Sequence, residues 1–288
     1  LMLSLLIKFH FICLCLFFII LCILAVLYLL LKKYDQNNSV KDKPMIYKDL
    51  NIELLKKYDF NYFIKNHGDL NVLITYSKPE TVDMLGGFKK MTLREYCLNV
   101  MKKHPEWYFK TEDEYDFLAL IGIKNNIVQE FDKLFNHYNN IVYKNTSFWM
   151  GAKNSTTGWH TDMDDLSYLY IVKGKKRIHL INPKYNSNMY IKSVYTAGSK
   201  WSNINFKDVD YKKYPKFKDV EIETYTLNEG DAIYIPKNWW HSVENLEDSI
   251  GVTYKLYRPF QSIYTVLLEK IRKLYYIISM QNIKEREE

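Results

Sequence analysis

Two short segments of the chain hold side chains that could bind a metal ion. GWHTDMDD contains His160 and Asp162, and IPKNWWHSVEN contains His241. Residues i and i+2 of a strand point to the same face, so His160 and Asp162 can reach one point, and an imidazole from another strand would complete the set. Two histidines and one carboxylate favour Fe(II) and leave positions open for a co-substrate and dioxygen. Each segment alone is a weak signal. Both follow turn signals and lead into β-like runs, as metal ligands on the strands of a barrel would, which makes His160, Asp162 and His241 candidate metal ligands.

A third segment, YLYIVKGKKRIHLINP, places Lys176 on an expected strand after a glycine turn. A lysine inside a barrel is costly unless it meets an anion, and a dicarboxylate co-substrate would supply one. The alternative is a lysine on the solvent face of the strand, which the neighbouring Lys173, Lys175 and Arg177 fit well. Composition alone favours the solvent face, and both interpretations stay open at this point.

These residues lie among short expected strands. After residue 142, runs of β-branched and aromatic residues are separated by Gly, Pro, Asn and Asp, which predicts an antiparallel sandwich or barrel. Residues 44–140 have mostly helical periodicity, with one β-like run, LNVLITY, and with Thr92 as the expected N-cap of the helix MTLREYCLNVMKKH. Residues 261–281 return to a helical period with one apolar face, which could pack on the barrel or pair with a second copy of the chain.

The N-terminal segment has a different character. Residues 11–31 contain no charged or strongly polar side chain and end at Lys32 and Lys33. A helix of this length matches the roughly 30 Å hydrocarbon core of a bilayer. It exceeds the apolar region of about 7 to 15 residues in a signal peptide, and it lacks the polar stripe of a core helix. We expect residues 1–33 to be a single-pass membrane anchor, joined to the rest by a polar linker, 34–43.

Composition and charge narrow the class of protein. The chain has 288 residues, of which 48% are hydrophobic, and this excludes disorder and a disulfide mini-scaffold. The net charge is +7, and three of the 40 basic residues but no acidic one lie in residues 1–33. The small excess that remains indicates no nucleic-acid surface. Lysines are more numerous after the span than before it, which favours a cytoplasmic location for the large domain. Of the four cysteines only Cys97 lies outside the apolar run, so a cysteine metal site is not expected.

The stretch from Lys43 to Tyr257 resembles a known family. It is similar to the cupin-like, jumonji-C group of Fe(II)- and 2-oxoglutarate-dependent oxygenases, and most similar to the hypoxia-inducible-factor asparaginyl hydroxylase group. The motifs that carry the resemblance are KP at 43–44, MTLREY, FWMGAKNSTTGWHTD, VKGKKRIHLINP and GDAIYIPKNWWHSVENL. The resemblance implies a mainly β fold with helical additions: a double-stranded β-helix, or jelly-roll, over residues 141–260, helical cover over 44–140 and a C-terminal helix within 261–288.

The resemblance also implies roles for single residues. His160, Asp162 and His241 match the iron ligands. The co-substrate residues implied are Lys176, paired with the far carboxylate of 2-oxoglutarate, and Thr157, the hydroxyl donor to that carboxylate. Tyr108 matches a co-substrate tyrosine more loosely.

The chain departs from the family pattern near the co-substrate. Ser167 and Thr253 fall near places where the family often has asparagine, and we assign Thr253 to the co-substrate site. The interval from His160 to Lys176 is one residue longer than in the group it most resembles. These departures concern the packing of 2-oxoglutarate and leave the metal ligands intact.

The function implied is a membrane-anchored dioxygenase that uses Fe(II), 2-oxoglutarate and O2 to hydroxylate a protein side chain. Demethylation and RNA-base hydroxylation are the same chemistry on other targets. Two alternatives come from other classes: a catalytically inactive cupin-like binding module tethered to a membrane, and a structural anchor whose C-terminal helix forms a homodimer. Survival of all three ligands together with Lys176 and Thr157 favours the enzyme.

Overall fold

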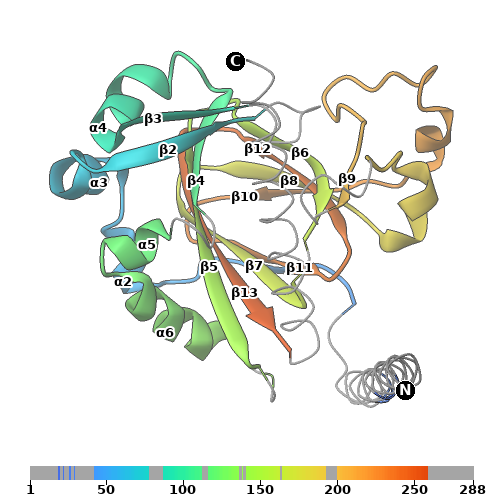
Figure 1. Cartoon of the computed structure of the whole chain (residues 1–288), viewed down its shortest axis with the longest axis horizontal. Helices are drawn as coiled ribbons and strands as arrows, with labels where there is room; N and C mark the ends of the chain where they lie inside the picture. The colour runs from blue at the N-terminus through green and yellow to red at the C-terminus, as the bar shows by residue number, and fades with distance from the viewer. Residues whose placement is uncertain are drawn as a thin grey trace, which may run out of the picture.

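The structure, a computed structural model, is built from two antiparallel sheets that face each other, with helices over the outer face of the larger sheet (Figure 1). The large sheet has the strand order β1-β11-β7-β13-β5-β4-β2-β3, and the small sheet has the order β10-β8-β12-β6-β9. The residues that it describes are 42–77, 87–111, 116–135, 138, 141–162, 164–192 and 200–258, with Ile19, Cys22, Val26 and Leu29.

The N-terminal part of the domain contains the helices that cover the large sheet and four strands of that sheet. Its elements are β1 (Met45–Tyr47), α2 (Glu53–Lys56), α3 (Phe60–His67), β2 (Asn71–Tyr76), β3 (Phe88–Thr92), α4 (Leu93–Glu95), the π-helical turn η1 (Tyr96–Val100), β4 (Trp107–Thr111), α5 (Phe117–Leu120) and α6 (Lys124–Phe135). The expected cap is present, because the Thr92 hydroxyl accepts a hydrogen bond from the Glu95 backbone N–H at 3.1 Å. The β-like run LNVLITY forms β2, whereas β1, β3 and β4 were not expected. β1 pairs with β11 and β4 pairs with β5, both distant in the chain, whereas β3 pairs with β2, the strand before it. Local periodicity does not encode such pairing.

The C-terminal part supplies most of both sheets. Its strands are β5 (Tyr143–Gly151), β6 (Thr156–Thr161), β7 (Leu166–Lys173), β8 (Lys176–Ile181), β9 (Lys200–Trp201), β10 (Glu223–Leu227), β11 (Ala232–Pro236), β12 (Trp240–Asn245) and β13 (Ser249–Tyr257), with the 3-10 turns η2 (Pro183–Asn188) and η3 (Pro215–Asp219). From β5 to β8 and from β11 to β13, successive strands alternate between the two sheets. This winding confirms the expected mainly β, jelly-roll-like fold with helices.

Alternation along the strands gives the large sheet two different faces. On β13, Val252, Tyr254 and Leu256 pack in the main core under the helices. The Phe131 ring of α6 lies 5.5 Å from the Tyr254 ring, between centroids. The residues between them, including Thr253 and Lys255, therefore point to the small sheet. The inner space is filled at one end by apolar side chains of both sheets, namely Leu169, Ile171, Ile178, Leu180, Leu227, Ile233, Ile235 and Trp239.

The long connection between β8 and β10 covers the outer face of the small sheet. Trp159 of β6 and Trp240 of β12 are buried there against Ile204 and Phe217 of the connection. The Trp240 indole N–H donates a hydrogen bond to the Asn186 side-chain oxygen at 2.7 Å. Both tryptophans thus pack behind the strands that carry the histidines.

Two predicted elements lie outside the described residues. They are the C-terminal helix at 261–281 and the span at 11–31, of which only four separate residues are described. Within the described part of the chain, no helix has the length and apolar character needed to cross a bilayer. The membrane anchor therefore has no support from the structure and stays a prediction.

Candidate metal centre

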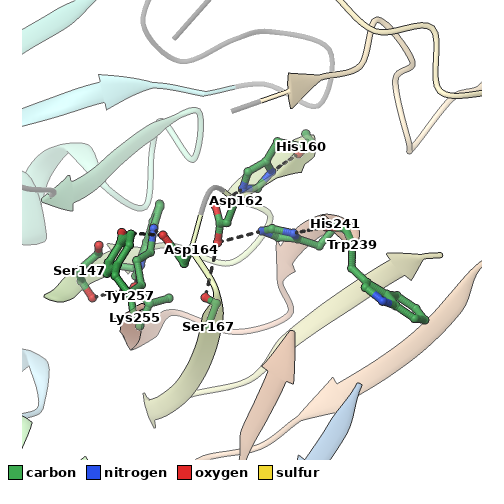
Figure 2. Close-up of polar contacts among 12 residues, drawn as sticks. Ser147, His160, Asp162, Asp164, Ser167, Trp239, His241, Lys255 and Tyr257 are labelled. Carbon is green, nitrogen blue, oxygen red and sulfur yellow. Dashed lines mark hydrogen bonds and ion pairs between the residues drawn. The ribbon is translucent and has the colours of Figure 1, made fainter. Parts of the chain in front are cut away.

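His160, Asp162 and His241 come together as predicted. The two histidines are paired neighbours on β6 and β12, and Asp162 follows the end of β6. One ligand atom from each residue lies within 4.8 Å of the others. His160 Nε2 is 3.8 Å from Asp162 Oδ1, and His241 Nε2 is 3.7 Å from Asp162 Oδ2. Figure 2 shows the two imidazoles converging on the carboxylate.

Backbone carbonyls orient both imidazoles. His160 Nδ1 lies 2.8 Å from the Gly158 carbonyl oxygen, and His241 Nδ1 lies 3.2 Å from the Trp239 carbonyl oxygen. A carbonyl can only accept, so each Nδ1 carries the proton and each Nε2 keeps its lone pair for a metal. The Trp201 indole stacks on the His160 ring at 4.6 Å between centroids, which fixes its plane.

The electrostatics suit metal binding. Burial lowers the pKa of His160 and lowers that of His241 to about 3, so both are neutral at pH 7. Burial alone would raise the pKa of Asp162, but the positive Lys255 and the two imidazoles outweigh it and hold this pKa below its usual range. Ser167 also donates a hydrogen bond to Asp162 Oδ2 at 3.5 Å. Two neutral nitrogens and one carboxylate form the donor set that fits Fe(II) with open positions.

A β-bulge brings Thr157 to the same face as His160. Their three-residue spacing would place them on opposite faces of a regular strand. However, His241 pairs with His160 whereas Val243 pairs with Thr157, so β6 takes three steps where β12 takes two. Among the described residues the Thr157 hydroxyl makes no hydrogen bond. It remains available as a donor inside the barrel.

Lys176 lies further along the same inner face. His241, Val243 and Asn245 alternate on β12, and Asn245 pairs with Lys176 of β8. At about 3.3 Å per residue, the pair is roughly 13 Å along the sheet from the histidines, and Thr157 lies between them. The Lys176 side chain is 1% exposed, so the solvent-face alternative is wrong. The strand position of Lys176, opposite Asn245, decides between the two interpretations, and composition does not.

The surroundings of the Lys176 ammonium are polar but uncharged. Its Nζ donates to the Asn245 side-chain oxygen at 2.7 Å and to the Tyr108 hydroxyl at 3.1 Å. No carboxylate among the described residues pairs with it, and burial lowers its pKa to about 7. Tyr108 thus lies beside Lys176, and Asn245 is a partner that the motifs did not reveal. A buried cation without a counter-ion fits the far carboxylate of a dicarboxylate.

Glycines make room for these side chains. A Cβ on Gly151 would lie 2.3 Å from the Tyr108 ring, and one on Gly251 would lie 3.1 Å from Lys176 Cε. Thr253 faces the same space from β13. Its hydroxyl accepts a hydrogen bond from the Trp149 indole at 3.2 Å, so Thr253 orients that ring beside the site.

Two further residues near the metal ligands were missed from the sequence. Lys255 Nζ lies 3.4 Å from Asp164 Oδ2, and the Tyr257 hydroxyl donates to Asp164 Oδ1 at 2.6 Å. Lys255 pairs across the sheet with Ser167, the residue that contacts Asp162. The available signal was the period of two in SIGVTYKLY, because Thr253, Lys255 and Tyr257 alternate onto one face.

Sequence comparison with known proteins assigns the chain to a family. Residues 34–262 match the family described as a cupin-like domain. The chain is 30% identical over 103 residues to human (Homo sapiens) HSPB1-associated protein 1, which is 35% of this chain and 21% of that protein. It is 33% identical over 118 residues to JmjC domain-containing protein C of Dictyostelium discoideum, or 38% and 28% of the two chains.

A third relative carries an activity in its name. Lysine-specific demethylase JMJ31 of Arabidopsis thaliana is 27% identical over 110 residues, or 38% of this chain and 20% of that protein. The chain therefore aligns with less than a third of each of these three relatives. The family match and these relatives support the wider cupin and JmjC family, and the asparaginyl-hydroxylase subgroup stays a prediction.

Proposed function

The chain belongs to the cupin-like domain family, and from this premise we propose that it is an Fe(II)- and 2-oxoglutarate-dependent oxygenase that hydroxylates a protein side chain. Fe(II) held by two histidines and a carboxylate, with 2-oxoglutarate and O2, supplies oxidation of a C–H bond. His160, Asp162 and His241 would hold the metal. Lys176, Thr157, Tyr108 and Thr253 would surround the co-substrate.

The observation that carries the proposal is Lys176. Burying an ammonium group without a counter-ion costs free energy, and the low pKa reflects this cost. A dicarboxylate with one end at the metal would place its other carboxylate toward this lysine. Tyr108 and Thr157 would then donate hydrogen bonds to the same carboxylate. Metal site and lysine together select a 2-oxo dicarboxylate over a monocarboxylate.

Apolar and aromatic side chains line the rest of the inner space around Lys176, which is 1% exposed. The apolar side chains of Leu169, Ile171 and Ile178 close one end of the space between the sheets. The indoles of Trp149 and Trp201 stand beside Thr253 and His160. Exclusion of water strengthens the ion pair that Lys176 would make.

Substrate class is part of the proposal. A protein side chain is the expected target, and the demethylase among the relatives keeps removal of a methyl group from lysine as the nearest alternative, because it is the same C–H oxidation on another carbon. Base hydroxylation of RNA is a third target for this chemistry.

Release of succinate from 2-oxoglutarate tests the reaction class. We expect the full chain with Fe(II) and ascorbate to release succinate, and Asp162→Ala to lose this activity because two imidazoles alone hold Fe(II) weakly. Ser187→Ala, which changes an exposed residue of η2, is the matched control. Equal release by wild type and Asp162→Ala would contradict the oxygenase and leave the catalytically inactive binding module.

Membrane attachment and a cytoplasmic domain are separate proposals, supported by residues 1–33 of the sequence. We expect the full chain to sediment with membranes after expression and to resist extraction with carbonate. A chain that begins at residue 34 should remain in the supernatant. Sedimentation of neither form would contradict the anchor without affecting the proposed reaction.

A further inference from the structure

A second carboxylate lies beside the metal ligands and is held by groups from another strand. Asp164 is 4% exposed and follows Asp162 by two residues. Its oxygens contact Tyr257 at 2.6 Å and Lys255 at 3.4 Å, both on β13. In Figure 2 the Asp164 carboxylate points toward Tyr257 and Lys255, while His160 and His241 lie on the other side of Asp162.

The loop that carries this carboxylate is anchored just beyond it. The Asp165 carboxylate contacts Lys237 Nζ at 2.8 Å and accepts a hydrogen bond from the Arg258 backbone N–H at 2.9 Å. Its side chain is fully buried. The backbone after Asp164 is therefore held in place, and the orientation of the Asp164 side chain depends on its own partners.

A free carboxylate here would compete for the metal. Carboxylates are good ligands for divalent iron. Asp164 follows Asp162 by two residues and contacts Lys255, whose cross-strand neighbour Ser167 donates a hydrogen bond to Asp162. A fourth protein ligand would occupy one of the positions that a chelating co-substrate and dioxygen need. An ion pair with the Lys255 ammonium and a hydrogen bond from the Tyr257 phenol give the carboxylate alternative partners.

We propose that Lys255 and Tyr257 are positioning residues that hold the Asp164 carboxylate off the metal, so that Asp162 is the sole carboxylate ligand. This inference rests on the proposed function, because it concerns positions left open for 2-oxoglutarate. Lys255 is well placed for the role, since it also pairs across the sheet with Ser167, which contacts Asp162.

The test uses the full chain loaded with Co(II), whose visible absorption reports the number of ligands, and 2-oxoglutarate as the probe. In Lys255→Met we expect a more highly coordinated Co(II) spectrum before the probe is added. The affinity for 2-oxoglutarate should fall by about tenfold or more, the usual scale for a change around a metal site. In the double variant Lys255→Met, Asp164→Asn, both the spectrum and the affinity should return toward wild type, because the competing carboxylate is gone.

Three outcomes decide against the inference. Lys255→Met could bind 2-oxoglutarate like wild type, it could leave the Co(II) spectrum unchanged, or the double variant could bind as weakly as the single one. The last result would mean that Lys255 itself contacts the co-substrate. If Lys255→Met fails to fold by circular dichroism, Tyr257→Phe, which removes only one hydrogen bond, should shift both readouts in the same direction.

Failure of the proposed function gives a different pattern. In that case wild-type protein would bind Co(II) but show no spectral change with 2-oxoglutarate. The Co(II) spectra of Lys255→Met and of the double variant would still differ if Asp164 is the competing ligand, so the two proposals are tested separately.

Discussion

At the scale of single residues, the site depends on how burial sets protonation. Burial keeps His160 and His241 neutral, while the charge of Lys255 keeps Asp162 ionised, so the ligands are ready for a cation at neutral pH. At Lys176, by contrast, burial disfavours the charged ammonium form that co-substrate binding requires. The ammonium form is favoured again when an anion binds beside it.

This predicts a pH dependence for co-substrate binding. The dianion binds the ammonium form of Lys176, whose pKa without a ligand is about 7, so above that pH binding must take up a proton. The dissociation constant for 2-oxoglutarate should therefore rise with pH above 7, by up to about tenfold per pH unit. Calorimetry in buffers of different ionisation enthalpy should show the proton uptake. In Lys176→Arg, which stays charged, the dependence should be absent; a flat profile for wild type would contradict this role of Lys176.

At the scale of elements, the metal site joins strands that are distant in the chain. β6 and β12 carry the histidines, β8 carries Lys176, and β13 carries Thr253 and Lys255. The loop after β6, the end of β11 and the end of β13 meet at Asp165. The metal ligands are thus held by a buried ion cluster as well as by the sheet.

Removal of that cluster should destabilise the fold. Asp165→Ala removes a fully buried carboxylate that contacts the largely buried Arg258, and the loss of one partner of a buried pair costs about 3 kcal/mol or more. Urea unfolding of the metal-free chain should show this loss. Asp69→Ala, which breaks the exposed pair with Arg94, should cost less than about 1 kcal/mol. Equal losses of unfolding free energy in the two variants would mean that the Asp165 cluster stabilises the fold no more than an exposed ion pair does.

A second element-scale prediction concerns β5 and β4. In Gly151→Ala the new Cβ would overlap the Tyr108 ring, which must then move away from Lys176. We expect weaker binding of 2-oxoglutarate with unchanged affinity for Co(II), because the metal ligands lie on other strands. Titrations of both ligands measure this, and parallel losses of the two affinities would indicate a general distortion instead.

At the scale of the whole molecule, metal binding should stabilise the folded chain. The ligands converge only when both sheets are formed, so the unfolded chain binds the ion weakly. At a Co(II) concentration about 100 times the dissociation constant, the free energy of unfolding should rise by about 2.7 kcal/mol. For a domain of this size that is a Tm shift of about 5 to 10 °C, seen by calorimetry. His241→Ala should show little shift, and an equal shift in that variant would place the ion elsewhere.

The sequence by itself indicated the candidate metal ligands and the mainly β class, because a His-x-Asp pair and alternating apolar residues are local patterns with direct geometric meaning. The same holds for the Thr92 helix cap. It did not reveal β1, β3 and β4: β1 pairs with the remote strand β11, β4 pairs with β2 and β5, and β3 pairs with the preceding strand β2.

Only the tertiary structure decided which polar residues face the space between the two sheets. Composition favoured solvent for Lys176, yet the register of β8 on β12 buries it. The bulge that turns Thr157 inward arises from a mismatch between two strands, and the Lys255–Asp164 contact joins residues 91 positions apart only when β13 lies beside β7. The local sequence gives the chemical type of each side chain. The face of the sheet on which that side chain lies depends on pairing between strands that are far apart in the chain.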